Sequence, residues 1–238
     1  MKFYRFLLAL FFSIYTLNTL SAQTPRERIT FLIEDFIAKK DSLKAEFGLN
    51  KKTPPDYELQ SLVALSRYPE LKKEKIEFKC ARGAYTMAAR PNFRSILCWG
   101  KKNRKYQVFI NTKSRHGGLL LSEVPFNEQV GVMGHELAHI LYYTQKSALR
   151  ILLDGIAYTS KKTFRAKFER DTDKVAIHRG FGWQIYDFST RVLNEKKIPE
   201  KYKSYKRKIY LSPESVLDYI KGEGTLLVPV NDTPSSGF

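Results

Sequence analysis

The sequence contains few of the residues that build cross-linked scaffolds. Its 238 residues include only two cysteines, Cys80 and Cys98, and only four histidines. Two cysteines exclude a scaffold held by several disulfides and allow one bridge, which an exported protein can form in an oxidising compartment. Two unpaired thiols are the alternative. A zinc site built on this pair is disfavoured because no further cysteine joins them.

Long apolar runs are also scarce. Residues 6–17 form the one long apolar stretch, and it is short for a membrane span, which needs roughly 20 residues. Lys2 and Arg5 precede this stretch and small residues follow it, which is the order of a secretory signal peptide. We therefore predict a signal peptide over residues 1–22, cleaved before Gln23, and an exported protein that is periplasmic or secreted. An uncleaved anchor is the alternative, and no membrane span is expected after cleavage.

Acidic residues are outnumbered by basic ones. The chain has 41 Lys+Arg and 24 Asp+Glu, a net charge of +17. A basic surface attracts polyanions, so an anionic component of the cell envelope is a candidate partner, with a solvated surface as the plain alternative. The basic residues are spread along the chain and no run resembles a nucleic-acid-binding module, so no specific nucleic-acid binding is expected. The 43% of hydrophobic residues suffices for a buried core and excludes a disordered chain.

The length and the absence of internal repeats favour one domain. We place it at residues 23–221 and expect a flexible C-terminal tail at 222–238. A capping box at Thr24–Glu27 and helical apolar spacing as far as Phe47 predict a first helix that ends at Gly48. Further helices are expected at 57–67, 126–145, 147–160, 163–178, 183–195 and 213–221.

Strands are expected at 75–80, 93–99 and 105–111, with a turn at 100–103. On the last strand Tyr106, Val108 and Ile110 share one face. This strand immediately precedes the segment that carries the strongest motif, so it could pair with an extended substrate. The predicted fold class is α+β, a mainly helical domain with a small antiparallel sheet.

The strongest motif is His135-Glu136-Leu137-Ala138-His139, an HExxH sequence. Two histidines four residues apart lie about 40° apart around a helix, so both imidazoles can reach one metal ion. Glu136 lies beside them and can take the proton of a metal-polarised water. The surrounding segment lacks proline and is flanked by apolar residues, as a buried helix requires. Two ordinary histidines on a core helix are the alternative interpretation.

A catalytic zinc site needs a third protein ligand. The metzincin class is excluded because Tyr142 and Gln145 occupy the positions of its glycine and third histidine. The downstream candidates are Glu169, Asp171, Asp173 and His178.

The helical wheel separates these candidates. Glu169 and Asp173 face the same way, whereas Asp171 and His178 point about 180–200° away from Glu169. A helix that offers Glu169 to the metal therefore also offers Asp173, which can hydrogen-bond a ligating histidine and fix its ring. His178 is expected to be structural, and His116 structural or exposed.

The combination of HExxH with a later Glu-x-x-x-Asp resembles the gluzincin arrangement of zinc peptidases. The segment 168–176 resembles the glutamate helix of the M48 family of metallopeptidases, and residues 130–134 also fit that family. The resemblance covers roughly residues 125–190. It implies a zincin-like fold, one Zn²⁺ per chain held by His135, His139 and Glu169, Glu136 as general base, and Asp173 as a further catalytic residue. The sequence departs from the family at Thr172, where an alanine is common, and it lacks the membrane helices of many members.

These features predict an exported zinc metalloendopeptidase that hydrolyses a peptide or protein substrate. One alternative is a catalytically silent zincin-like module; another is a polyanion-binding envelope protein with an incidental HExxH. The intact Glu136 favours the enzyme. The donor that would stabilise the oxyanion is left open among Tyr158, His178, Tyr202 and Tyr205.

Overall fold

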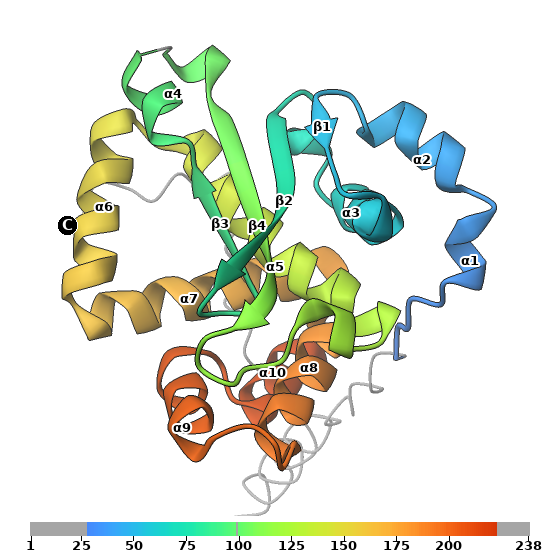
Figure 1. Cartoon of the computed structure of the whole chain (residues 1–238), viewed down its shortest axis with the longest axis vertical. Helices are drawn as coiled ribbons and strands as arrows, with labels where there is room; N and C mark the ends of the chain where they lie inside the picture. Colours follow the sequence, from blue (N-terminus) through green and yellow to red (C-terminus); the bar gives the residue numbers. More distant parts are fainter. Residues whose placement is uncertain (1–27, 99, 223–238) are drawn as a thin grey trace, which may run out of the picture.

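The computed structural model of the protein describes residues 28–98 and 100–222 (Figure 1). The predicted signal peptide lies outside the described residues, as do residues 223–238 of the predicted tail. Within the described part of the chain, no helix is both long and apolar enough to cross a membrane.

The fold is α+β and mainly helical, with one small sheet. The sheet has four strands, β1 (Lys51–Lys52), β2 (Lys75–Gly83), β3 (Met87–Pro91) and β4 (Lys105–Ser114). Their order is β1-β2-β4-β3; β1 and β4 run parallel to β2, and β3 runs antiparallel to β4. The predicted antiparallel sheet is therefore wrong, and the sheet is mixed.

The cause of that error is the segment predicted as a strand at 93–99. Residues Phe93–Cys98 instead form helix α4, which begins where the Asn92 side chain accepts a hydrogen bond from the backbone N–H of Ser95. Because the chain crosses over between β2 and β4 through β3 and α4, β2 and β4 run in the same direction.

The central strand is β4. Tyr106, Val108 and Ile110 are buried on one face, as their alternation predicted. Both edges of β4 are paired, so the prediction that residues 105–111 could pair with a substrate is wrong. The free edge beside β4 belongs to β3, which packs against α5 (Phe126–Gln145).

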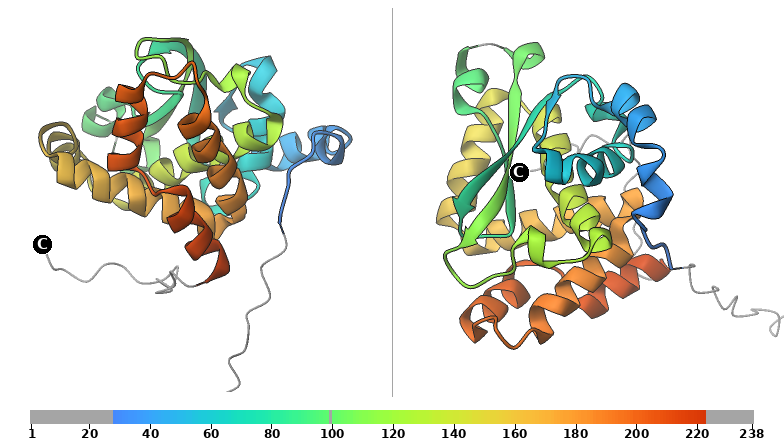
Figure 2. Two further views of the ribbon diagram at one scale, coloured as in Figure 1. Left: turned by 90° about the horizontal axis from the view of Figure 1, so that it is seen from below. Right: turned by 45° about the vertical axis from the view of Figure 1, so that its right-hand side comes forward.

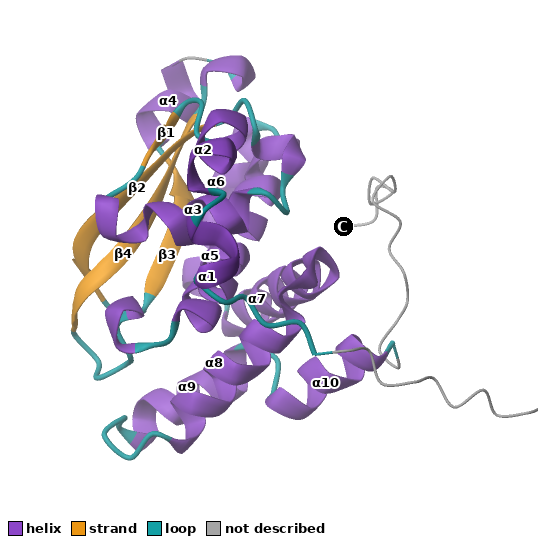
Figure 3. Cartoon of the chain, turned by 90° about the vertical axis from the view of Figure 1, so that its right-hand side faces the viewer, coloured by secondary structure: helices purple, strands orange, loops and turns teal. Residues whose placement is uncertain are grey.

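The helices surround α5. Helices α3, α7 and α8 all contact it, and Figure 3 shows α5 and α7 on one side of the sheet. Helices α8, α9 and α10 gather at one end of the molecule, beyond the end of the sheet (Figures 1 and 2). Their bounds are α3 Glu58–Leu65, α6 Ala148–Ser160, α7 Lys162–Ala176, α8 Gly182–Asn194, α9 Glu200–Ile209 and α10 Pro213–Lys221.

Two glycines let α8 and the turn before it approach α5. A Cβ atom at Gly134 would lie 2.5 Å from the ring of Phe181, and one at Gly131 would lie 2.3 Å from Cβ of Gln184. Larger residues at these positions would push α8 away from the helix that carries the HExxH motif.

The predicted helix up to Phe47 is only partly correct. Residues 28–33 are not helical, and the helices are the short α1 (Glu34–Ile37) and α2 (Lys40–Phe47). Ile29, Leu32, Ile33 and Ile37 are exposed, so they do not form the buried stripe that the spacing suggested. Phe31 is buried instead, and its N–H donates to the Asn127 side chain.

Helix α9 was not predicted because its many lysines obscured the apolar positions. Tyr202 and Ile209 are its buried residues. Cys80 carries a free, exposed thiol on β2; the side chain of Cys98, its predicted partner, lies outside what the structure describes.

Candidate metal centre

Helices α5 and α7 bring three potential metal ligands together. His135 and His139 come from α5 and Glu169 comes from α7, and all three are buried. The Nε2 atoms of His135 and His139 lie 3.1 and 3.3 Å from Oε2 of Glu169. This cluster could hold a metal ion.

The spacing of the three donor atoms fits such an ion. With metal–ligand bonds of about 2.0–2.1 Å, neighbouring corners of a tetrahedral zinc site lie about 3.3–3.4 Å apart. The two distances to Glu169 are close to this edge length. Three protein donors leave a fourth corner open, which is the pattern of catalytic rather than structural zinc sites.

Asp173 orients the ring of His135. Its Oδ1 atom lies 2.9 Å from Nδ1 of His135, and its Oδ2 atom accepts the backbone N–H of Leu211. A carboxylate bonded to Nδ1–H leaves the lone pair of Nε2 directed at the cluster. Glu169 and Asp173 therefore lie on the same face of α7, towards the two histidines, as their spacing predicted.

Thr172 orients the other histidine ring. Its hydroxyl donates to the backbone oxygen of Phe168 at 2.8 Å, so its lone pairs face Nδ1 of His139 at 3.3 Å. That arrangement favours the tautomer with a proton on Nδ1 and a free lone pair on Nε2. The ring of Phe168 stacks on His139 at a centroid distance of 5.3 Å. Thr172 thus contacts one of the histidines of the candidate metal cluster.

Replacing Thr172 by valine should weaken zinc binding roughly tenfold, since outer partners of metal-bound histidines typically contribute factors of 10–100. Valine keeps the shape of threonine but removes the acceptor of the His139 proton. Competition with a chromophoric chelator measures the affinity. Thr159→Val, an exposed threonine on α6, is the matched control, and equal affinities for both variants would contradict the role of Thr172.

Tyr158 supports the third ligand. Its hydroxyl, from α6, donates to Oε1 of Glu169, which leaves Oε2 to face the histidines. Burial and then the charge of Glu169 raise the pKa of Tyr158, so the phenol keeps its proton. Tyr158 was one candidate for the oxyanion donor, and the structure places it on the ligand carboxylate instead.

The remaining candidates lie elsewhere. Asp171 forms ion pairs with Lys167 and Lys174 on the outer side of α7, as the wheel predicted. His178 lies in the turn 177–181 and is not part of the cluster, and His116 is exposed. Among the other tyrosines, the Tyr205 hydroxyl bonds that of Tyr85, and Tyr202 is buried.

Glu136 is a buried carboxylate with one oxygen left unsatisfied. The residue is 6% exposed, and its Oε2 atom has no hydrogen-bond partner among the described residues. Burial raises the pKa of Glu136, while the neighbouring charges of His139 and His135 and the backbone of Ala89 on β3 oppose that rise. A buried acceptor without a partner is costly, and a water molecule at the cluster would satisfy it.

The protonation of His135 links metal binding to pH. Burial alone would lower its pKa, but hydrogen bonds to Asp173 and Glu169 raise it to about 10. In the metal-free protein His135 therefore carries a proton at neutral pH, and an incoming ion must displace it. The apparent zinc affinity should fall about tenfold for each unit of pH decrease below about 10.

Isothermal titration in buffers of different ionisation enthalpy measures this release, which should be at least about one proton per zinc at pH 8. Asp173→Asn removes the strongest cause of the raised pKa of His135, so it should reduce the proton release. A zinc affinity that is flat between pH 7 and 9 would contradict the proton on His135.

No protein-family model, curated protein or solved structure matches this chain. The fit of the cluster to a metal therefore rests on its own geometry. Sequence reasoning missed the role of Thr172, although its position three residues after Glu169 on the same helix was a usable signal.

Proposed function

We propose that the protein is an exported, zinc-dependent metallopeptidase with a zincin-like fold, related in its motifs to the M48 family. The observation that best supports this proposal is that a cluster of three potential metal ligands lies beside a buried carboxylate, Glu136. The Oε2 atom of Glu136 has no hydrogen-bond partner among the described residues. One group can hold the ion and the other can take a proton from water beside it, which are the two requirements of metal-assisted hydrolysis.

The bound zinc would supply the Lewis acidity that brings the pKa of a water molecule towards about 7. His135, His139 and Glu169 would hold the ion, with their orientation fixed by Asp173, Thr172 and Tyr158. Glu136 would accept the proton of the attacking water and deliver it to the departing amine. Burial, which raises the pKa of Glu136, makes the carboxylate a better base.

The free edge of β3 supports a peptide as the substrate. This edge strand packs against α5, and the backbone of Ala89 interacts with Glu136. An extended peptide that pairs with β3 would therefore run past the cluster. Edge pairing binds main-chain groups, so it suits a substrate defined by its peptide bonds.

Export rests on the apolar segment 6–17 with its flanking charges, and an anionic envelope partner rests on the net charge of +17. The test of the proposed function is the zinc content of the purified chain together with its cleavage of a complex peptide mixture. We expect one zinc per chain and cleavage that a chelator abolishes and zinc restores. Zinc without cleavage would favour the catalytically silent module, and absence of zinc would favour the polyanion-binding protein.

A further inference from the structure

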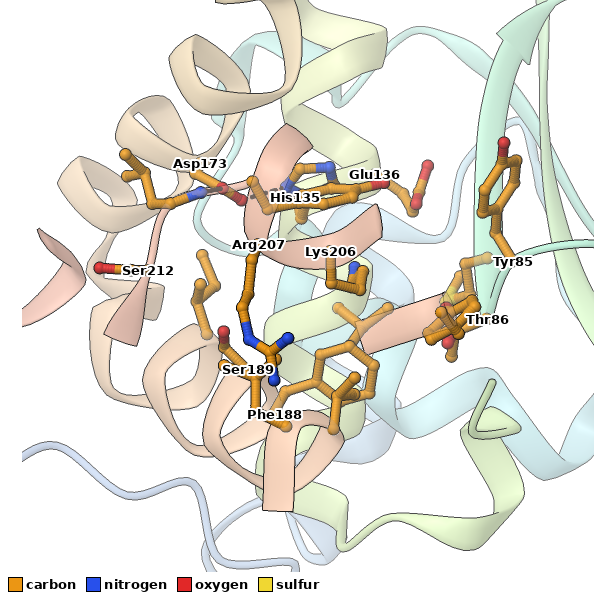
Figure 4. Close-up of a pocket in the computed structure, with 18 residues that line it drawn as sticks. Tyr85, Thr86, His135, Glu136, Asp173, Phe188, Ser189, Lys206, Arg207 and Ser212 are labelled. Carbon is orange, nitrogen blue, oxygen red and sulfur yellow. Dashed lines mark hydrogen bonds and ion pairs between the residues drawn. The ribbon is translucent and has the colours of Figure 1, made fainter. Parts of the chain in front are cut away.

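A pocket adjoins the metal centre on the side of Glu136. Its walls come from β3, α5, α7, α8 and α9 and are mainly apolar, with Asp173, His135 and Glu136 along one side (Figure 4). The wall residues that matter here are Met87, Val132, Phe188, Val192 and Tyr202. Its volume is about 70 Å³, and since one water needs about 10–15 Å³, the pocket holds about five atoms of the size of water.

Two positively charged side chains, Lys206 and Arg207, line this pocket. The Lys206 residue is partly exposed, and it lines the pocket with its ammonium group close to two aromatic rings. Nζ lies 3.4 Å from the centroid of the Tyr210 ring and 5.7 Å from that of Phe188. Within residues 28–98 and 100–222 this ammonium has no ion-pair or hydrogen-bond partner.

The neighbouring basic residue, Arg207, differs from Lys206 because it has an ion-pair partner. Arg207 also borders the pocket, but it is exposed and pairs with Glu200 at 2.6 Å. The negative charges that act on Lys206 come from Asp173, Glu169 and Glu136 of the metal centre, and they oppose the lowering of its pKa by burial. With a divalent cation in the cluster, two of these three charges are offset, and Lys206 is left with little compensation.

An ammonium group that has no ion pair and lies among apolar walls is stabilised by a negative partner. The apolar walls would accept a short aliphatic stem, and Nζ would accept a carboxylate at its end in a charge-assisted hydrogen bond. A glutamate side chain has five heavy atoms beyond Cα, which matches the room available.

We propose that this pocket is a substrate subsite for a carboxylate, with Lys206 as the residue that determines the specificity. The carboxylate comes either from an acidic side chain or from the C-terminus of the peptide. This inference rests on the proposed peptidase function and adds to it the class of substrate.

The experiment is a digest of a mixed peptide library, with the cut sites read by mass spectrometry. Wild-type protein should cut at sites enriched in Glu or Asp at one fixed position from the cut. Cuts at a fixed distance from a free C-terminus, lost when the peptides are amidated, would instead identify the terminal carboxylate as the source. Lys206→Met should lose the preference and still bind zinc. Lys201→Met, on an exposed position of α9 about 140° away around the helix, should keep it.

The proposed subsite would be wrong if the cut sites showed neither an acidic residue at a fixed position nor a fixed distance from a free C-terminus. It would also be wrong if Lys206→Met left the cleavage pattern unchanged. A uniform loss of cleavage for all peptides in Lys206→Met and in Lys206→Gln, with normal folding and zinc content, would also overturn it, because that result assigns Lys206 to the reaction itself.

A binding measurement separates this inference from the proposed function. The zinc-loaded Glu136→Gln protein should bind a glutamate peptide, or one with a free C-terminus, at least about tenfold more tightly than its amide counterpart. When Lys206→Met is added to the Glu136→Gln protein, the carboxylate peptide and its amide counterpart should bind with equal affinity. Absence of cleavage by the wild-type protein would refute the peptidase, whereas absence of a tenfold preference in both pairs would refute the subsite.

Discussion

Replacing Glu136 by glutamine is expected to abolish peptide hydrolysis and to leave the metal in place. The amide has the shape of the carboxylate but cannot accept the proton of a water molecule. Loss of a positioned general base typically lowers the rate by about 10²–10⁴-fold. We expect an effect near the upper end because the unsatisfied Oε2 atom of Glu136 is enclosed, which leaves little room for a solvent base to replace it.

The measurement is kcat on a fluorogenic peptide at saturating zinc, with metal content determined on the same samples. Asp171→Asn is the matched control, since it removes one carboxylate from the outer face of α7, where Asp171 is paired with lysines. It should keep full activity. Hydrolysis by Glu136→Gln at more than about a tenth of the wild-type rate would refute Glu136 as the base.

The cluster of His135, His139 and Glu169 could be predicted from the sequence because helical geometry determines most of it. The spacing of His135 and His139 requires one helix face, and the same rule aligns Glu169 with Asp173 on a second helix. Both helices are described at nearly the predicted bounds, α5 at 126–145 and α7 at 162–176. The helix spacing also placed Thr172 near this face, but its role as the partner of His139 depends on where its hydroxyl donates, which the folded structure determines.

The strand order of the sheet and the lining of the pocket could not be predicted from the sequence, because both depend on contacts between distant parts of the chain. Strand pairing is a long-range property, and alternation within 105–111 gave the buried face of β4 correctly but not its neighbours. The run Phe93–Trp99 is β-like in composition, yet the Asn92 cap starts a helix there. Nothing in the sequence distinguishes Lys206 from the other lysines of residues 196–208, and it lines the pocket because α9 packs against α7 beside the candidate metal cluster.

Replacing Glu169 by alanine is expected to abolish the zinc binding that we propose for this cluster. Mutation of residues that merely orient a ligand costs about 10–100-fold in affinity, so loss of a ligand should cost more than about 100-fold. Glu169 is 3% exposed; it accepts one hydrogen bond from Tyr158 and faces both histidines. The charges and hydrogen bonds of His139 and His135 outweigh burial and hold the pKa of Glu169 well below its usual range, so the group is an ionised ligand at neutral pH.

The effect can be measured as zinc per chain after dialysis and as the thermal shift on addition of zinc. A ligand at 100 times its Kd stabilises the folded state by about 2.7 kcal/mol, and this increment should vanish in Glu169→Ala. Asp171→Ala, two residues away on the same helix, should retain both zinc and shift. Equal zinc in Glu169→Ala and wild type would exclude Glu169 as a ligand and transfer the role to Asp173, the nearest remaining carboxylate on that face. Glu169→Gln then separates charge from shape: the amide keeps the bond to Tyr158, so a loss as large as that of alanine would assign the affinity to the negative charge that the two histidines face.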